Sequence, residues 1–192
     1  MTSETKSLDG IRSEVEDLAA KISAEQWMLP TYGHSEETGR PHIEVDGSFY
    51  YYVQSERGGE SSRWKSNSLD ELLFVIFRGV VSAFNWKEPK RPKIEGKDQR
   101  RQWFQQNVEL MSILSDNWAN RLAEFQQRLI ELHPFDDSSD VRSDFARTLQ
   151  GQGRSREESW KIASERYPQP KHGTFQESVK LYEEFHLPHG QP

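Results

Sequence analysis

Residues 69–84 contain the feature that most constrains the fold, an unbroken run of apolar side chains from Leu72 to Phe77. A helix at a protein surface keeps one polar face, so a helix that is apolar on every side must be buried. Ser68 and Glu71 have the spacing of a capping box, which places the start of the helix at Leu69. The sequence therefore predicts a central helix, Leu69–Phe84, around which the rest of the chain packs.

The segment before this helix carries the strand patterns. Residues 42–45 alternate in polarity, Asp46-Gly47 is a two-residue hairpin signal, and Phe49–Val53 forms the return strand. Residues 56–59 make a second turn, and Arg63–Lys65 supplies a third strand. Because the return strand is aromatic on both faces, we expect both faces of the sheet to be covered, one of them by the central helix.

Apolar residues at helical spacing predict further helices on both sides of this unit. The first stripe runs from Leu8 to Ile22 in steps of three and four residues. After the central helix, Asp98 opens one helix, Asp116 caps the next, and Pro134 ends it. The short link between these two helices predicts that they are antiparallel neighbours.

After Asp137 the apolar stripes become narrow, and glycines and prolines interrupt them, which predicts short helices. The expected fold is α+β and helix-rich, with a small three-stranded antiparallel sheet packed against the central helix and a surrounding helical bundle. We expect an α+β core over residues 1–137 and a C-terminal helical extension over residues 138–192 that packs on the core.

Composition excludes several classes of protein. The 192 residues include no cysteine, which rules out disulfides, thiol nucleophiles and thiolate metal sites. The first residues lack the apolar core of a signal peptide, and no apolar run is long enough to span a membrane. We therefore expect a cytoplasmic protein without a membrane partner.

The net charge of −6 is concentrated at the front of the chain, where residues 1–46 hold ten acids against four bases. An acidic front can steer a basic partner towards the protein. It can equally be the solvated face of a helix, and both interpretations stay open.

No catalytic signature is present: the sequence has no P-loop, dinucleotide fingerprint, nucleophile elbow or zincin motif. Asp136, Asp137 and Asp140 form an acidic cluster, and such carboxylates can hold Mg²⁺ or Ca²⁺. The same aspartates can instead cap a helix near Ser139 or pair with arginines. A metal-dependent enzyme that uses Asp136 and Asp137 is therefore one alternative.

Five charged residues predict a structural ion network. Glu56 and Arg57 stand at a hairpin turn, whereas Asp98, Arg100 and Arg101 stand at a helix start. Arginine forks suit such networks, and the set lacks a nucleophile and a base. We interpret the five as one buried structural cluster.

A second alternative rests on residues 87–101, which hold seven bases against three acids and lie between Trp86 and Trp103. Basic residues with nearby aromatics favour a nucleic-acid-binding adaptor. The run is short, broken by prolines and mixed with acids, whereas a nucleic-acid footprint is usually broader.

Several segments carry a family pattern when they are taken in order. They are the strand pair Ile43–Val53, Glu56-Arg57-Gly58, the helix start Leu69–Phe74, Asp98–Phe104, and His133–Asp137. In this order, over about residues 40–137, they resemble the immunity protein 63 family of bacterial polymorphic toxin systems.

The resemblance implies a non-enzymatic protein that stays in the cytoplasm of the producing cell and binds a cognate toxin domain. It would block the active site of the toxin or access of the substrate, with no cofactor and no metal. Partner-specific contacts are expected on exposed loops, where surface identity is free to change. The partner-binding candidates, chosen for charge and expected exposure, are Glu36, Glu37, Asp136, Asp137 and Asp140.

Overall fold

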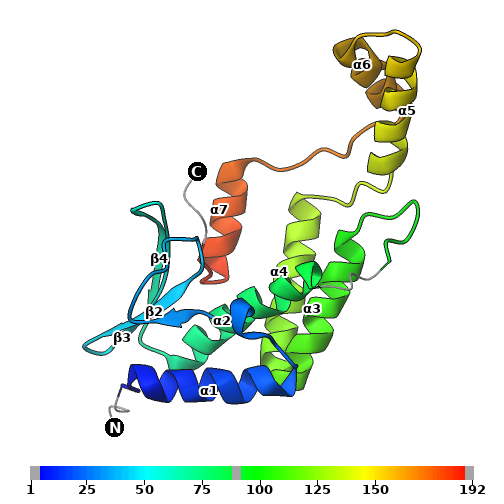
Figure 1. The fold of residues 1–192 in the computed structure, drawn as a ribbon. Coiled ribbons are helices and arrows are strands. Elements are labelled where there is room, and N and C mark those ends of the chain that lie inside the picture. Colours follow the sequence, from blue (N-terminus) through cyan, green and yellow to red (C-terminus); the bar gives the residue numbers. More distant parts are fainter. Residues whose placement is uncertain (1–4, 88–91, 189–192) are drawn as a thin grey trace.

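The computed structural model describes residues 5–87 and 92–188 and confirms the helix-rich α+β class (Figure 1). A sheet lies on one side of the molecule, and helices fill the rest. The elements are α1 (Leu8–Lys21), η1 (Gln26–Met28), β1 (Thr31–Tyr32), β2 (His42–Asp46), β3 (Phe49–Glu56), β4 (Gly59–Ser66), α2 (Leu69–Ala83), η2 (Phe84–Trp86), α3 (Arg100–Leu114), α4 (Asp116–Leu132), α5 (Ser139–Gly151), α6 (Arg156–Arg166) and α7 (Phe175–Glu184). Across the two described ranges, none of these helices is long and apolar enough to cross a membrane.

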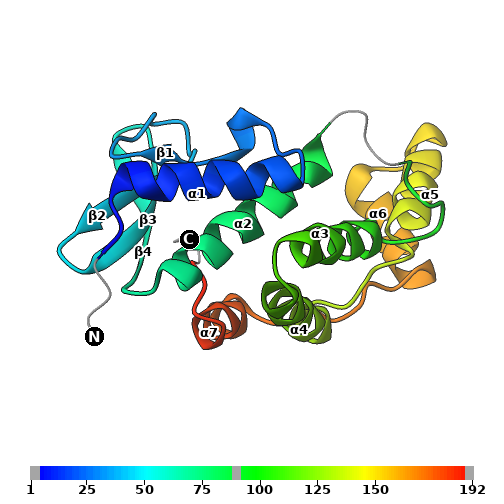
Figure 2. The same cartoon turned by 90° about the horizontal axis from the view of Figure 1, so that it is seen from below.

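The central helix α2 is buried as predicted, and every residue from Leu72 to Phe77 is at most 4% exposed. It packs against β3 and β4 on one side and against α3 on the other (Figure 2). The hydroxyl of Ser68 accepts a hydrogen bond from the Glu71 amide at 3.3 Å. The Glu71 carboxylate pairs instead with Arg121 of α4 at 2.8 Å, so only one half of the capping box forms.

The sheet has four strands in the order β1-β2-β3-β4, one more than expected. The predicted strands β2, β3 and β4 are antiparallel neighbours. The added strand β1 runs parallel to β2 and pairs Thr31 with His42 and Tyr32 with Ile43. A two-residue strand has no period of its own, so sequence alternation could not reveal it.

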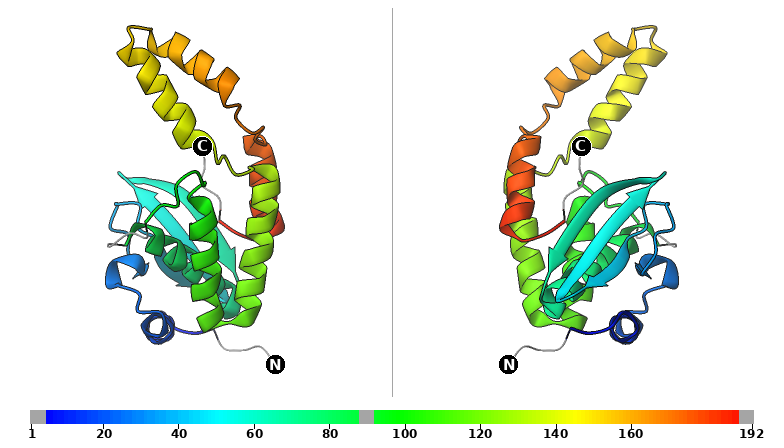
Figure 3. Two further views of the ribbon diagram at one scale, coloured as in Figure 1. Left: turned by 90° about the vertical axis from the view of Figure 1, so that its right-hand side faces the viewer. Right: turned by 90° about the vertical axis from the view of Figure 1, so that its left-hand side faces the viewer.

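Helices cover one face of the sheet (Figure 3). On the opposite face, called the open face here, His42 and Val53 are buried whereas Phe49 is exposed, so the expectation that both faces are covered holds only for part of that face. On the open face, the Arg63 guanidinium lies 5.3 Å from the centre of the Tyr51 ring. The Lys65 ammonium lies 5.4 Å from the centre of the Phe49 ring. These cations take the place of a second layer, because their long stems and charges pack over aromatic rings. The helix-covered face buries Ile43, Tyr52 and Trp64.

Helices α3 and α4 pack side by side, joined by a one-residue link, as the sequence predicts. Ser115, and not Asp116, caps α4, because its hydroxyl accepts a hydrogen bond from the Trp118 amide at 3.3 Å. The Trp118 indole donates to Asp70 of α2 at 3.0 Å and stacks on Phe77 with ring centres 6.2 Å apart. This tryptophan therefore joins α4 to the central helix.

The C-terminal segment contains two different structures. Helices α5 and α6 pack on each other and stand out from the rest of the molecule, and this hairpin (Ser139–Arg166) is called the arm below (Figure 1). Helix α7 then returns to pack along α4. The chain leaves α4 at Leu132 and comes back beside it at Gly173, whose amide donates to the Leu132 carbonyl at 2.7 Å. The division into domains at residue 137 stays a prediction.

Candidate partner-binding site

The base of the arm collects most of the charged residues that the sequence singled out. The Asp98 carboxylate accepts hydrogen bonds from Arg100 at 2.7 Å and from the Asp136 amide at 2.9 Å. In return, the Asp137 carboxylate accepts from the Asp98 amide at 2.8 Å and from Arg101 at 3.0 Å. These reciprocal bonds fasten the start of α3 to the link between α4 and α5.

Arg100 also fixes the direction in which the chain leaves α4. Its guanidinium donates to the carbonyls of His133 at 2.9 Å and Pro134 at 2.8 Å. The same guanidinium and that of Arg101 lie over the ring of Phe135, 5.3 and 4.1 Å from its centre. The free carbonyls beyond the helix end are thereby satisfied, which helix termini require.

A buried arginine of α5, Arg142, completes the cluster of charged residues at the base of the arm. Only 2% of the Arg142 side chain is exposed, and it forms an ion pair with Asp136. Its guanidinium also donates to the Tyr167 carbonyl, just after α6, at 2.9 Å. One side chain therefore ties together the α4–α5 link and both helices of the arm. Sequence reasoning missed Arg142, because an arginine in an amphipathic helix is normally assigned to the solvent face.

Two carboxylates at the base of the arm have lowered pKa values. Burial alone would raise the pKa of Asp98, but the hydrogen bonds from Arg100 and from two backbone amides outweigh it and lower the pKa to about 2. Hydrogen bonds from Arg101 and the Asp98 amide lower the pKa of Asp137 to about 2. A catalytic base works best with a pKa near the working pH, so these carboxylates are poor proton acceptors.

The pKa of the adjacent His133 is lowered by burial, and by the nearby His172 and Arg100. Its ring nitrogen lies 2.8 Å from the Ser178 hydroxyl of α7. This histidine therefore favours the neutral form where α4, α7 and the arm meet.

The structure does not bring the five partner-binding candidates together. Asp140 forms an ion pair with Lys93 at the arm base, near Asp136 and Asp137. Glu36 lies 3.2 Å from Arg40, and the Glu37 carboxylate accepts a backbone hydrogen bond from the β3–β4 turn at 2.6 Å. The sheet and the arm base lie on opposite sides of the molecule (Figure 1). Each of the five carboxylates has a partner within the chain, and their role in binding stays a prediction.

The expected ion cluster consists of two separate groups. Glu56 and Arg57 pair with each other at 3.3 Å in the exposed β3–β4 turn. Within residues 5–87 and 92–188, neither forms an ion pair with Asp98, Arg100 or Arg101. The β3–β4 turn with Glu56 and Arg57 lies at one end of the sheet, whereas Asp98, Arg100 and Arg101 lie at the base of the arm.

Within residues 5–87 and 92–188, the structure adds no support to the metal-dependent enzyme or to the nucleic-acid-binding adaptor. Among the residues that the structure describes, no group of three or more histidines, aspartates or glutamates is placed to hold a metal ion. In the basic segment, Lys87 pairs with Glu25 at 3.1 Å and Lys97 lies 3.6 Å from Asp137. Residues 88–91 of that segment lie outside the described residues.

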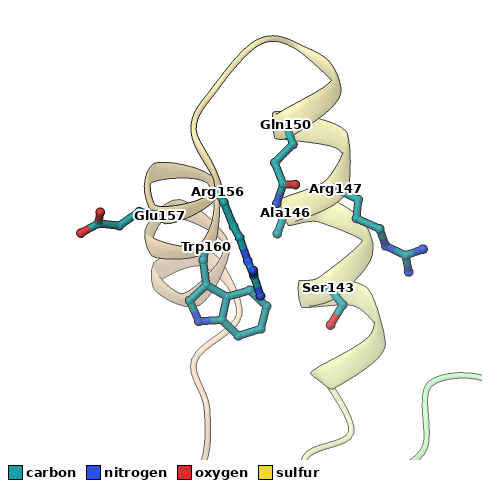
Figure 4. A pocket seen from close by; sticks show the side chains of 7 residues that line it. All are labelled: Ser143, Ala146, Arg147, Gln150, Arg156, Glu157 and Trp160. Carbon is teal, nitrogen blue, oxygen red and sulfur yellow. The ribbon is translucent and has the colours of Figure 1, made fainter.

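The arm carries a groove of about 730 Å³ between α5 and α6 (Figure 4). Trp160 forms one wall with 42% of its surface exposed, and Ala146 faces it from α5. The Arg156 guanidinium reaches into the space between the helices, whereas Glu157 points away from it. Sequence reasoning missed this groove, and the only signal was a tryptophan in a narrow helical stripe.

Comparison with known proteins bears on residues outside the arm. No curated protein and no solved structure gives a match. The model of the immunity protein 63 family matches residues 46–128, which include β3, β4, α2, α3 and most of α4. The segments 40–45 and 129–137 of the suspected resemblance, and the arm, lie outside this match. This match bears out the suspected resemblance over residues 46–128, and that part of the chain is similar to the immunity protein 63 family.

Proposed function

We propose that this protein binds and neutralises a cognate bacterial polymorphic toxin in the cytoplasm of the cell that produces both. The match of residues 46–128 to the immunity protein 63 family is the observation that carries this proposal. Neutralisation is non-catalytic: the bound protein occludes the active site of the toxin or the path of its substrate.

The chemistry of the arm base supports a binding role over a catalytic one. The carboxylates of Asp136 and Asp137 are engaged by Arg142 and Arg101, and the pKa of Asp137 is about 2. A metal ion would have to displace these arginines before it could use both carboxylates. We therefore do not favour the metal-dependent enzyme.

The acidic candidates keep a proposed role as contacts for a basic toxin surface. Glu36 and Asp140 have half-exposed carboxylates whose partners, Arg40 and Lys93, are also near the surface. Exposed ion pairs are weak, so a basic side chain of a partner can replace the internal one at little cost.

Co-expression tests the proposed function. The toxin domain encoded beside this chain is expressed in a bacterial host, with and without the full-length protein. Growth restored only in the presence of the protein, together with co-purification of the two at equal stoichiometry, is the expected result. Toxicity that persists, with no complex on purification, would reject the proposal.

A further inference from the structure

We propose that the groove of the arm grips an acidic segment of the toxin, with Arg156 pairing with a carboxylate and Trp160 covering an apolar side chain. This inference rests on the proposed function, and it adds the surface and the chemistry of the partner segment.

The arm is placed and built for contact with another molecule. It stands out from the molecule, so its groove is open to a partner (Figures 1 and 4). The side chains buried between its helices are mostly small, such as Ala146, Ser159 and Ala163. Small residues bring the two helices together while Trp160 stays at the surface. The groove volume lies within the range of about 300–1,000 Å³ that is usual for binding sites.

The charges around the groove identify the partner as acidic. Arg147 and Arg154 are neutralised by Asp144 and Glu158. Among the residues that the structure describes, no carboxylate forms an ion pair with Arg156, and the neighbouring Glu157 points away (Figure 4). Arg156 is also the first residue of α6, where the helix dipole disfavours a positive charge. A carboxylate from a partner would pair with the Arg156 guanidinium, and its negative charge would offset the unfavourable positive charge at the helix start.

The groove is held in place before a partner arrives. The Arg142 guanidinium lies 5.8 Å from the centre of the Trp160 ring, and the same arginine is fixed by Asp136 and the Tyr167 carbonyl. A wall that is already ordered loses little conformational entropy on binding.

The open face of the sheet is a weaker candidate for the same role. Its Arg63 is already paired with Glu44 and Glu60, both at 2.7 Å. The guanidinium of Arg63 is therefore already engaged, whereas the arm presents Arg156 without an ion-pair partner among the described residues, beside an exposed tryptophan.

A pair of charge reversals on α6 tests the proposal with full-length protein and the toxin domain identified by co-expression. Arg156→Glu should weaken binding by roughly tenfold or more, because it places like charges together at the contact. Lys161→Glu is the matched control, since this exposed residue of the same helix does not line the groove. The control should change the affinity by no more than about twofold. The thermal midpoint of Arg156→Glu should not fall, because an acid suits the first turn of a helix.

A cross-linking experiment identifies the group that Arg156 meets. The Arg156→Lys variant is treated with a carbodiimide in complex with the toxin domain, which joins a lysine to a nearby carboxylate without a spacer. The expected product links position 156 to an aspartate or glutamate of the toxin.

The outcomes separate this inference from the proposed function. If wild-type protein binds the toxin and Arg156→Glu binds equally well, the groove proposal is overturned while the proposed function stands. A cross-link from position 156 to a second copy of this chain would also overturn it. If wild-type protein neither binds nor protects, both proposals fall.

Discussion

The Arg142 guanidinium is paired with the Asp136 carboxylate although the arginine side chain is almost completely buried. The same group binds the Tyr167 carbonyl at the end of the arm. A buried charge is tolerated only while its partners are present, so this arginine decides whether the arm keeps its position.

Removal of this charge should therefore destabilise the arm. Arg142→Ala leaves Asp136 without its partner and should cost about 3–5 kcal/mol where the pair is buried. Urea denaturation measures the loss, and hydrogen exchange should show the largest loss of protection in α5 and α6. Arg147→Ala is the control, because its ion pair with Asp144 is exposed and contributes about 1 kcal/mol or less. Equal losses in the two variants would contradict this interpretation.

Gly79 lies within α2 beside the Tyr52 hydroxyl. A methyl group at position 79 would meet that hydroxyl oxygen at 3.1 Å. Gly79→Ala should therefore fail to give the gain of about 1 kcal/mol that alanine brings to a helix interior. In a Tyr52→Phe background the hydroxyl is absent, and the same substitution should recover most of this gain.

A double-mutant cycle with urea denaturation checks this coupling between Gly79 and Tyr52. An identical effect of Gly79→Ala in both backgrounds would show that the hydroxyl does not restrict position 79.

Trp118 joins α4 to the central helix through both packing and a hydrogen bond. Trp118→Ala should cost about 3–5 kcal/mol of unfolding free energy, as for other buried tryptophans. Asp70→Ala should cost about 1–3 kcal/mol, because it leaves the buried indole nitrogen without an acceptor. Phe175→Ala serves as an exposed aromatic control and should change stability by less than about 0.5 kcal/mol. A loss at Phe175 similar to that at Trp118 would contradict the assignment of the core.

The low pKa of Asp98 makes the arm base sensitive to acid. Its pKa is about 2 in the folded protein, compared with an ordinary value of 3.8. The unfolded chain therefore takes up this proton first as the pH falls, so the stabilisation is complete above about pH 5 and is lost towards pH 2. Urea denaturation of the wild-type protein and Asp98→Asn at pH 6, 4, 3 and 2 should show a difference that shrinks with falling pH. A difference that stays constant would mean that this carboxylate is not responsible.

The sequence predicts the elements with a clear period and a local signal. The apolar run of α2, the Asp46-Gly47 hairpin and the antiparallel α3 and α4 were all readable, because neighbouring residues alone encode them. On α5 the residue types do not indicate the buried face, because the apolar Val141 is 44% exposed whereas Arg142 beside it is buried. A hydrophobic period assigns burial by residue type. It therefore does not identify a buried arginine, such as Arg142, whose charge is neutralised by a residue outside its helix.

The same limit applies to the candidate site. Asp137 was identified as acidic and accessible, but its partner Arg101 lies 36 positions away in the sequence. No spacing rule connects such residues, so the sequence leaves open whether these aspartates are solvated or paired with arginines. The groove of the arm could not be predicted for a related reason, since it exists only where two short helices meet.

The hydrogen bond between the Gly173 amide and the Leu132 carbonyl brings together the two ends of the segment that contains the arm. The arm is therefore encoded by one continuous stretch of the gene, inserted between two adjacent points of the fold. The arm lies between these two residues, and the link before it is fastened to the start of α3 rather than to the sheet or α2. A single contiguous stretch of coding sequence can therefore be exchanged, lengthened or lost while the sheet and α2 keep their neighbours. Recombination at this point would exchange the arm, the proposed recognition surface, and leave the sheet and α2 in place.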